Sequence, residues 1–209
     1  MDILYEDAQI VVCVKPVGQD AEQAVPALLQ AQLGGAAPLC VHRLDKAVGG
    51  VMVYARTKAA AGRLQAAFSG HETEKTYLAV VKGVPDPPEA TLTDLLYHDA
   101  RANKTFVVQR QRRGVKEARL DYRLLETARA LSLVHITLHT GRSHLIRVQF
   151  ASRQLPLWGD SRYGGGPGSP ALWAWRLTFP HPVTGQALTF SAPPPDREPW
   201  QVFSTLKEF

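Results

Sequence analysis

Residues 41–55 read VHRLDKAVGGVMVYA, a charged turn that runs through two glycines into an apolar stretch. The run from Val51 to Ala55 is apolar and partly β-branched, which predicts a buried strand. Asp45 stands in the turn before it, flanked by basic residues, and such a carboxylate is a plausible active-site group. The alternative is an ordinary turn aspartate paired with Arg43 or Lys46. The tetrapeptide alone leaves both interpretations open.

The neighbouring segments extend this strand into a mixed sheet. Strands are predicted over 10–14, 51–55, 75–82, 131–138, 171–179 and 187–190, within a strand-rich 91–126, and helices over 21–33, 58–68 and 143–152. Thr57 is a plausible N-cap for the second helix. Pro26 is expected to interrupt or kink the first. Because strands outnumber helices and no regular βαβ alternation occurs, we expect an α+β fold with a central, mainly antiparallel mixed sheet flanked by helices.

The composition is that of an ordinary globular protein of 209 residues, 45% hydrophobic and 21% charged. No run reaches the roughly 18 apolar residues of a membrane span, and the first residues lack a basic flank typical of a secretory signal. Cys13 and Cys40 stand apart in apolar surroundings, as reduced thiols do. We therefore expect a cytoplasmic protein without membrane association, and no zinc-binding spacing is present.

Two further motifs combine polar groups with apolar surroundings. In Thr140-Gly141-Arg142-Ser143-His144-Leu145-Ile146-Arg147-Val148, a helix would place His144 and Arg147 on one cationic face, with Ser143 as a possible N-cap. The alternative is an amphipathic surface helix with solvated charges. In Lys75-Thr76-Tyr77, the tyrosine is either a functional group or core packing with its hydroxyl at the edge.

Taken in order, these motifs resemble the RluA-type pseudouridine synthases, which modify ribosomal and transfer RNA. The matching segments are His42–Asp45, Gly50–Thr57, Lys75–Tyr77 with Gly83, Thr140–Val148 and Gly159–Gly164, with weaker matches at Tyr5–Asp7, Val14–Gly18 and Arg176–Pro182. The sequence departs from the family at three places. Val48-Gly49 replace a Thr-Ser pair, Leu145 replaces a glutamine, and Trp173 stands where a histidine is common.

The resemblance implies an isomerase that needs no cofactor or metal. It assigns the catalytic carboxylate to Asp45, stacking on the uracil to Tyr77, and orientation of the carboxylate to Arg147. It implies that Arg43 enters the RNA helix or binds phosphate near the flipped base. The other substrate-binding residues that it implies are His42, Arg142, His144 and Ile146. We expect residues 1–209 to form one catalytic domain without a separate N-terminal RNA-binding domain.

The expected partner is ribosomal or transfer RNA, bound by a monomer. The net charge of +5 and pI near 9.4 are compatible with that partner. The basic segment from Arg101 to Arg123 is a candidate for phosphate contacts, and its alternative is a solvated strand edge that resists aggregation. A catalytically idle RNA-binding protein remains the main alternative function. A metal-free hydrolase is more distant, because no nucleophile elbow is present.

Overall fold

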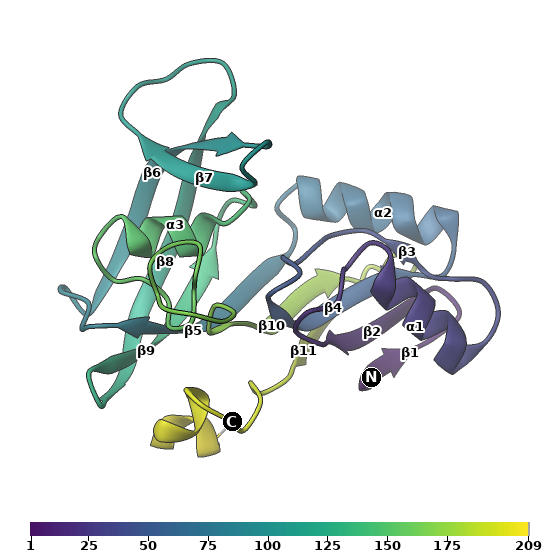
Figure 1. Cartoon of the computed structure of the whole chain (residues 1–209). Helices are drawn as coiled ribbons and strands as arrows, with labels where there is room; N and C mark the ends of the chain where they lie inside the picture. Colours follow the sequence, from purple (N-terminus) through teal and green to yellow (C-terminus); the bar gives the residue numbers. More distant parts are fainter. Residues whose placement is uncertain (209) are drawn as a thin grey trace. The chain divides into compact units, whose positions relative to one another are not determined.

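The computed structural model describes residues 1–208, which divide into two compact units. The first unit comprises Met1–Thr76 and Trp173–Pro193, and the second comprises Tyr77–Leu172 and the residues from Pro194 onward. Both contain sheet and helix, as Figure 1 shows, so the α+β class is confirmed. Whether the two units act as the one domain expected from the sequence stays a prediction. No described helix is long and apolar enough to cross a membrane.

The first unit is a sheet in the order β1-β2-β4-β10, with β3 pairing β4 and β11 pairing β10. Its elements are β1 (Ile3–Glu6), β2 (Ile10–Lys15), α1 (Ala24–Leu33), β3 (Leu39–Cys40), β4 (Gly49–Ala55), α2 (Lys58–Ser69), β10 (Leu172–Pro180) and β11 (Ala187–Ser191). All these pairs are antiparallel except β4 with β10. The predicted mainly antiparallel sheet is therefore present in this unit.

Strand β4 lies inside the core, and all seven of its residues are buried. Its register pairs Val53 with Val12 and Ala55 with Ile10 of β2. Alternate side chains of the two strands pack with Leu64 of α2 in one hydrophobic cluster. Side chains of a strand alternate between its faces, so the uninterrupted apolar run means that β4 is covered on both sides.

The starts of the two helices of this unit are explained by an N-cap residue in α2 and by the position of a proline in α1. Helix α2 starts after Thr57, whose hydroxyl accepts a hydrogen bond from the Ala60 N–H at 3.1 Å, which confirms the predicted N-cap. Helix α1 begins at Ala24, three residues later than predicted, so Pro26 falls in its first turn. A proline there costs no helical hydrogen bond because the first N–H groups have no partner within the helix. The expected interruption at Pro26 was therefore wrong.

Two of the departures from the family lie against each other. Gly49 pairs with Trp173 across the parallel β4–β10 contact, and a Cβ on Gly49 would lie 2.4 Å from the Cζ3 atom of Trp173. The indole N–H of Trp173 donates to the Ala192 carbonyl at 2.9 Å. The absence of a side chain at Gly49 thus makes room for the indole ring, and we interpret the two departures as one packing arrangement.

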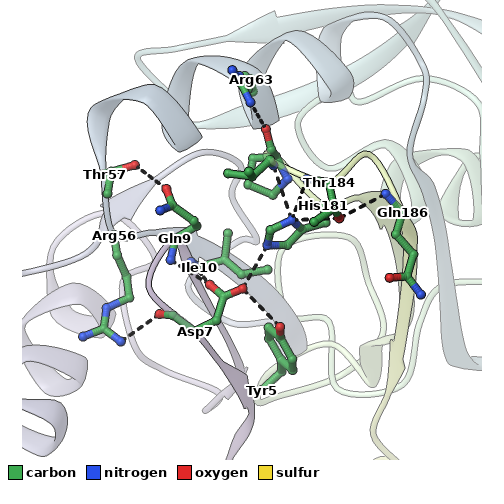
Figure 2. A network of polar contacts seen from close by, with 12 residues as sticks. Tyr5, Asp7, Gln9, Ile10, Arg56, Thr57, Arg63, His181, Thr184 and Gln186 are labelled. Atoms are coloured by element: carbon green, nitrogen blue, oxygen red, sulfur yellow. Dashed lines mark hydrogen bonds and ion pairs between the residues drawn. The ribbon is translucent and has the colours of Figure 1, made fainter.

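A polar network joins the two sequence segments of the first unit, with Asp7 in one and His181 in the other. Figure 2 shows its residues. Asp7 accepts backbone hydrogen bonds from Gln9 and Ile10 at 2.7 and 2.8 Å. Its other oxygen lies 2.9 Å from Nε2 of His181. Nδ1 of His181 accepts from the Thr184 N–H at 3.1 Å, so the proton on the neutral ring belongs to Nε2. These bonds lower the pKa of Asp7 although its burial acts in the opposite direction.

The second unit is a sheet in the order β5-β9-β8-β6-β7 with one helix. Its elements are β5 (Glu74–Lys82), β6 (Glu89–Asp99), β7 (Lys104–Val108), β8 (Val115–Ala128), β9 (Leu131–Leu138), α3 (Leu145–Ala151), and the 3-10 turns η1 (Trp200–Val202) and η2 (Ser204–Glu208). The pairs β9-β8, β8-β6 and β6-β7 are antiparallel. Helix α3 contacts β6 and β7, where Gln149 donates to Asp94 at 2.7 Å.

Helix α3 differs from its prediction in both start and surroundings. It begins at Leu145, and the residue before it is His144, in a left-handed conformation with φ 55°, not Ser143. No side chain caps its N-terminus. Every residue from Leu145 to Phe150 is buried, so the alternative of a surface helix with solvated charges was wrong, whereas a cationic face toward a cleft stays a prediction. The buried charge of Arg147 therefore needs a partner inside the protein.

Candidate active-site residues

The loop that carries Asp45 is tied to the turn after β2 through Lys15. This lysine has no exposed surface, and its Nζ donates to the carbonyls of Gln19 at 2.7 Å and Lys46 at 3.3 Å. The Gly18 N–H donates to the same Lys46 carbonyl at 2.8 Å. Burial lowers the pKa of Lys15 to about 8, while the negative charges of Asp20 and Asp45 act against that shift. Lys15 thus fixes the backbone next to Asp45, a role that the sequence motif did not reveal.

Asp45 itself is half-buried at the start of a tight turn, where its carbonyl accepts from the Val48 N–H at 2.9 Å. Its neighbour Arg43 is largely exposed, with Nη1 3.7 Å from a Glu22 carboxylate oxygen. A surface contact of this length contributes little to stability. The Arg43 side chain therefore lies at a position compatible with the predicted contact to RNA, which stays a prediction.

His42 is held inside the first unit by two contacts. Its Nε2 accepts from the Val53 N–H of β4 at 3.1 Å, and its ring stacks on Phe68 of α2 at a centroid distance of 4.4 Å. Burial, assisted by the positive charge of Lys75, lowers the pKa of His42 to about 3. These contacts favour a structural role for the neutral ring, and its predicted substrate contact stays untested.

Arg147 forms the main buried ion pair of the second unit. Its Nε and Nη2 atoms donate to the two oxygens of Asp160 at 2.7 and 2.8 Å, and the side chains are only 7% and 1% exposed. This parallel, two-bond geometry is the strongest arrangement that a guanidinium makes with a carboxylate. Asp160 lies in the matched segment Gly159–Gly164, but its role as the partner of Arg147 was missed from the sequence.

Tyr163 links this ion pair to the β6–β7 hairpin. Its ring centroid lies 5.1 Å from the Arg147 guanidinium carbon. Its hydroxyl accepts from the Thr105 N–H at 2.8 Å and lies 2.9 Å from Nδ1 of His144. The Thr105 hydroxyl donates to the Ser143 carbonyl at 2.8 Å. The connection into α3, the loop 159–164 and the start of β7 are therefore held together by one set of hydrogen bonds.

The remaining predicted residues of the second unit lie in different surroundings. Tyr77 on β5 is 8% exposed and Ile146 on α3 is 4% exposed. His144 is 9% exposed and engaged with Tyr163. Arg142 is exposed, and its Nε donates to the Glu117 carbonyl at 3.2 Å. Among these residues, Arg142 is the one whose side chain is most open to a ligand.

The structure thus distributes the predicted site over both units. The first unit contains His42, Arg43 and Asp45, and the second contains Tyr77, Arg142, His144, Ile146 and Arg147. The predicted meeting of Asp45 with Tyr77 and Arg147 stays a prediction. Within residues 1–208, no cluster of three or more His, Cys, Asp or Glu side chains is suited to hold a metal ion.

Comparison with known protein families gives a match over most of the chain. The model of the RNA pseudouridylate synthase family matches residues 9–152. A ribosomal large subunit pseudouridine synthase D of Vibrio cholerae is 34% identical over 224 residues, covering 94% of this chain and 68% of the relative. The protein of the same name from Nitrosomonas europaea is 33% identical, covering 94% of this chain and 62% of the relative. This chain therefore spans about two thirds of the length of these relatives.

Solved structures with the same fold include two human proteins. Human RNA Pseudouridylate Synthase Domain Containing 1 gives a TM-score of 0.83 at 24% identity, covering 94% of this chain and 84% of that chain. Human RNA Pseudouridylate Synthase Domain Containing 4 gives a TM-score of 0.79 at 24% identity, covering 93% of this chain and 88% of that chain. At this level of identity, the likeness supports the fold.

Proposed function

The chain belongs to the RNA pseudouridylate synthase family, and on that premise we propose that it converts a specific uridine of structured RNA into pseudouridine with Asp45 as the catalytic carboxylate. The observation that carries the proposal is the family match over residues 9–152, which contains Asp45, Tyr77 and Arg147. The relatives at 34% and 33% identity extend that match over 94% of the chain.

The reaction breaks the bond between ribose C1′ and uracil N1, rotates the base, and joins C1′ to C5. C5 gives up its proton and N1 becomes protonated, so no atoms or electrons are gained or lost overall. The chemistry needs an ionised carboxylate beside sugar and base, a surface that holds the detached base, and an acceptor for the C5 proton. We assign the first requirement to Asp45, whose loop is fixed by the buried Lys15.

Tyr77 is the proposed surface for the base, because a flat ring can hold a rotating uracil without imposing one hydrogen-bond pattern. Arg147 is the proposed cation that keeps Asp45 charged and oriented, since a nearby positive charge counteracts the effect of burial on a carboxyl pKa. The pair with Asp160 fixes the plane of the guanidinium before RNA binds. The position of the arginine is therefore set without help from the substrate.

Arg43 and Arg142 are the proposed contacts to the RNA around the extruded uridine. Both side chains are exposed. Extruding a base costs a few kcal/mol of lost stacking, which phosphate contacts must offset. The exposed cations between residues 101 and 123 are proposed to make further phosphate contacts that offset this cost.

Ribosomal RNA is the substrate class that we propose first, since both relatives above are named for the large ribosomal subunit. Transfer RNA is the alternative. We further propose that the protein acts in the cytoplasm as a monomer whose two units form one catalytic domain. Size-exclusion chromatography with light scattering tests the monomer, and an excess of dimer at micromolar concentration would contradict it.

The decisive experiment is pseudouridine mapping of total RNA from cells with and without this gene, and from deletion cells that express Asp45→Asn. At least one uridine is expected to lose its modification in the deletion strain and to regain it only with the wild-type protein. A map that is identical in all strains would favour the idle RNA-binding alternative. A modification restored by Asp45→Asn would remove Asp45 from the catalytic role.

A further inference from the structure

The face of the β6–β7 hairpin that points away from α3 carries exposed aromatic surface. The register pairs Tyr97 with Phe106, so both side chains point to the same side. Leu96 and Thr105 alternate with them along the strands and face the opposite side, toward α3. They are buried, with 3% and 1% of their surface exposed. Phe106 is 41% exposed. An aromatic ring that is left this open on a strand is available to a partner.

Cations lie over both rings of this face. The Lys104 Nζ is 5.6 Å from the Phe106 centroid, and the Arg112 guanidinium carbon is 4.9 Å from the Tyr97 centroid. Contacts of this kind contribute modestly at exposed sites. They also place each cation next to an aromatic ring, so that one ligand can contact a positive charge and a ring together.

The surrounding segment is strongly and almost uniformly positive. Residues 100–119 contain seven cations and one acidic residue, a net charge of +6, whereas the whole chain carries +5. The rest of the chain is therefore close to neutral, at −1. The seven cations are Arg101, Lys104, Arg110, Arg112, Arg113, Lys116 and Arg119. Across residues 1–208, none of them has a carboxylate oxygen within 4.0 Å.

We propose that this face binds an unpaired segment of RNA outside the reacting uridine, with one base stacked on Phe106 and the cations against its phosphates. Uncompensated charge of one sign is complementary to a phosphate backbone. An exposed ring suits an unpaired base, because bases inside a duplex have no free face for stacking. The proposal rests on the proposed function only in taking RNA as the partner.

The test uses a fluorescent twelve-nucleotide oligoadenylate, which contains no uridine and so cannot react. Anisotropy titrations compare the wild type with Phe106→Leu, which removes the aromatic face and keeps an apolar side chain. Loss of one stacked base is worth about 1 kcal/mol or more, so affinity is expected to fall at least about fivefold. Phe106→Tyr should bind as the wild type, and Val183→Ala, another exposed apolar position at 57% exposure, serves as the unaffected control.

The cations are tested separately through salt dependence. Arg112→Gln with Arg113→Gln is expected to reduce the slope of log affinity against log salt by about one to 1.5, since each phosphate contact in a single strand contributes about 0.7. The control is Arg129→Gln. Arg129 follows the far end of β8, a strand of 14 residues and hence roughly 45 Å long. An unchanged slope in the double variant, or an equal loss in the control, would overturn the assignment of the phosphate contacts.

Two further results separate stacking from general attraction to anions. A twelve-base-pair RNA duplex should bind Phe106→Leu and the wild type equally, since a duplex offers no free base. Polyglutamate of equal charge should compete poorly with the oligoadenylate. Oligoadenylate binding that is insensitive to Phe106→Leu, or equal competition by polyglutamate, would overturn the proposal. Asp45→Asn should bind the oligoadenylate normally, because this RNA contains no uridine. The binding titrations therefore test the stacking site, and the pseudouridine map tests the proposed catalytic function independently.

Discussion

Replacement of Asp160 by asparagine removes the partner of Arg147 while keeping the shape of the side chain. The carboxylate accepts two parallel hydrogen bonds from the guanidinium, and the two side chains are 7% and 1% exposed. An asparagine has one oxygen and one NH2 group, so one of the two bonds would be replaced by a donor facing a donor. The buried arginine would then lose one of these two hydrogen bonds and the negative charge of the carboxylate that accepts them.

The magnitude follows from that burial. Removing one partner of a buried ion pair costs about 3 to 5 kcal/mol, a large fraction of the about 5 to 15 kcal/mol that stabilises a typical protein. For a chain of this length, 1 kcal/mol corresponds to about 2 to 4 °C, so Asp160→Asn should lower the Tm by roughly 6 to 20 °C. The Tyr163 ring beside Arg147 offsets only a small part, since such contacts are worth about 0.5 to 2 kcal/mol.

The assay is urea unfolding at pH 7 for the wild type, Asp160→Asn, Arg147→Met and the double variant Arg147→Met with Asp160→Leu. The double variant should be less destabilised than the sum of both single losses, because it leaves neither member of the Arg147–Asp160 pair buried without the other. Single-turnover rates with RNA should fall at least tenfold in Asp160→Asn and recover in part in Asp160→Glu, which restores the charge. An Asp160→Asn protein within about 0.5 kcal/mol of the wild type and with a normal rate would refute the reasoning.

Three other outcomes are expected. Asp45→Asn should keep its fold by circular dichroism. Its single-turnover rate should fall below about a hundredth of the wild-type rate, which corresponds to an activation barrier higher by roughly 2.7 kcal/mol. A faster variant would exclude the catalytic role of the carboxylate. Gly49→Ser alone should lose about 1 to 3 kcal/mol through overpacking against the indole ring. Adding Trp173→His should recover part of that loss in urea unfolding, and additive losses would show that the two positions are independent. The pKa of His42 in the folded protein, about 3, lies below its ordinary value of 6.5. The unfolded chain therefore binds the proton first, and stability falls as pH drops from 6.5 toward 3, by about 1.4 kcal/mol per pH unit. His42→Gln should lack this part of the pH dependence. The free energy of unfolding of the wild type should therefore exceed that of His42→Gln by about 2 kcal/mol less at pH 5 than at pH 7. An equal difference at both pH values would contradict the low pKa of His42.

Local patterns were enough to locate most of the elements. The apolar run around Val53 and the alternation in residues 131–138 correspond to β4 and β9, the latter with the bounds predicted. Thr57 is an N-cap because its own hydroxyl satisfies an N–H three residues later. Each of these signals depends on residues a few positions apart, which is the range over which periodicity and capping operate. The ordered motifs also identified the family, because their spacing is itself a property of the sequence.

Contacts between distant residues could not be obtained in this way. That Asp160 holds Arg147, or that Gly49 makes room for Trp173, depends on which segments the fold brings together. Helix α3 was expected to be amphipathic, yet its charged residue is buried because a carboxylate 13 positions away compensates it. The open face around Phe106 likewise depends on strand register. The sequence by itself determined the elements, the family and the candidate residues, whereas the tertiary structure alone decided which charges are paired, because pairing depends on distance in space.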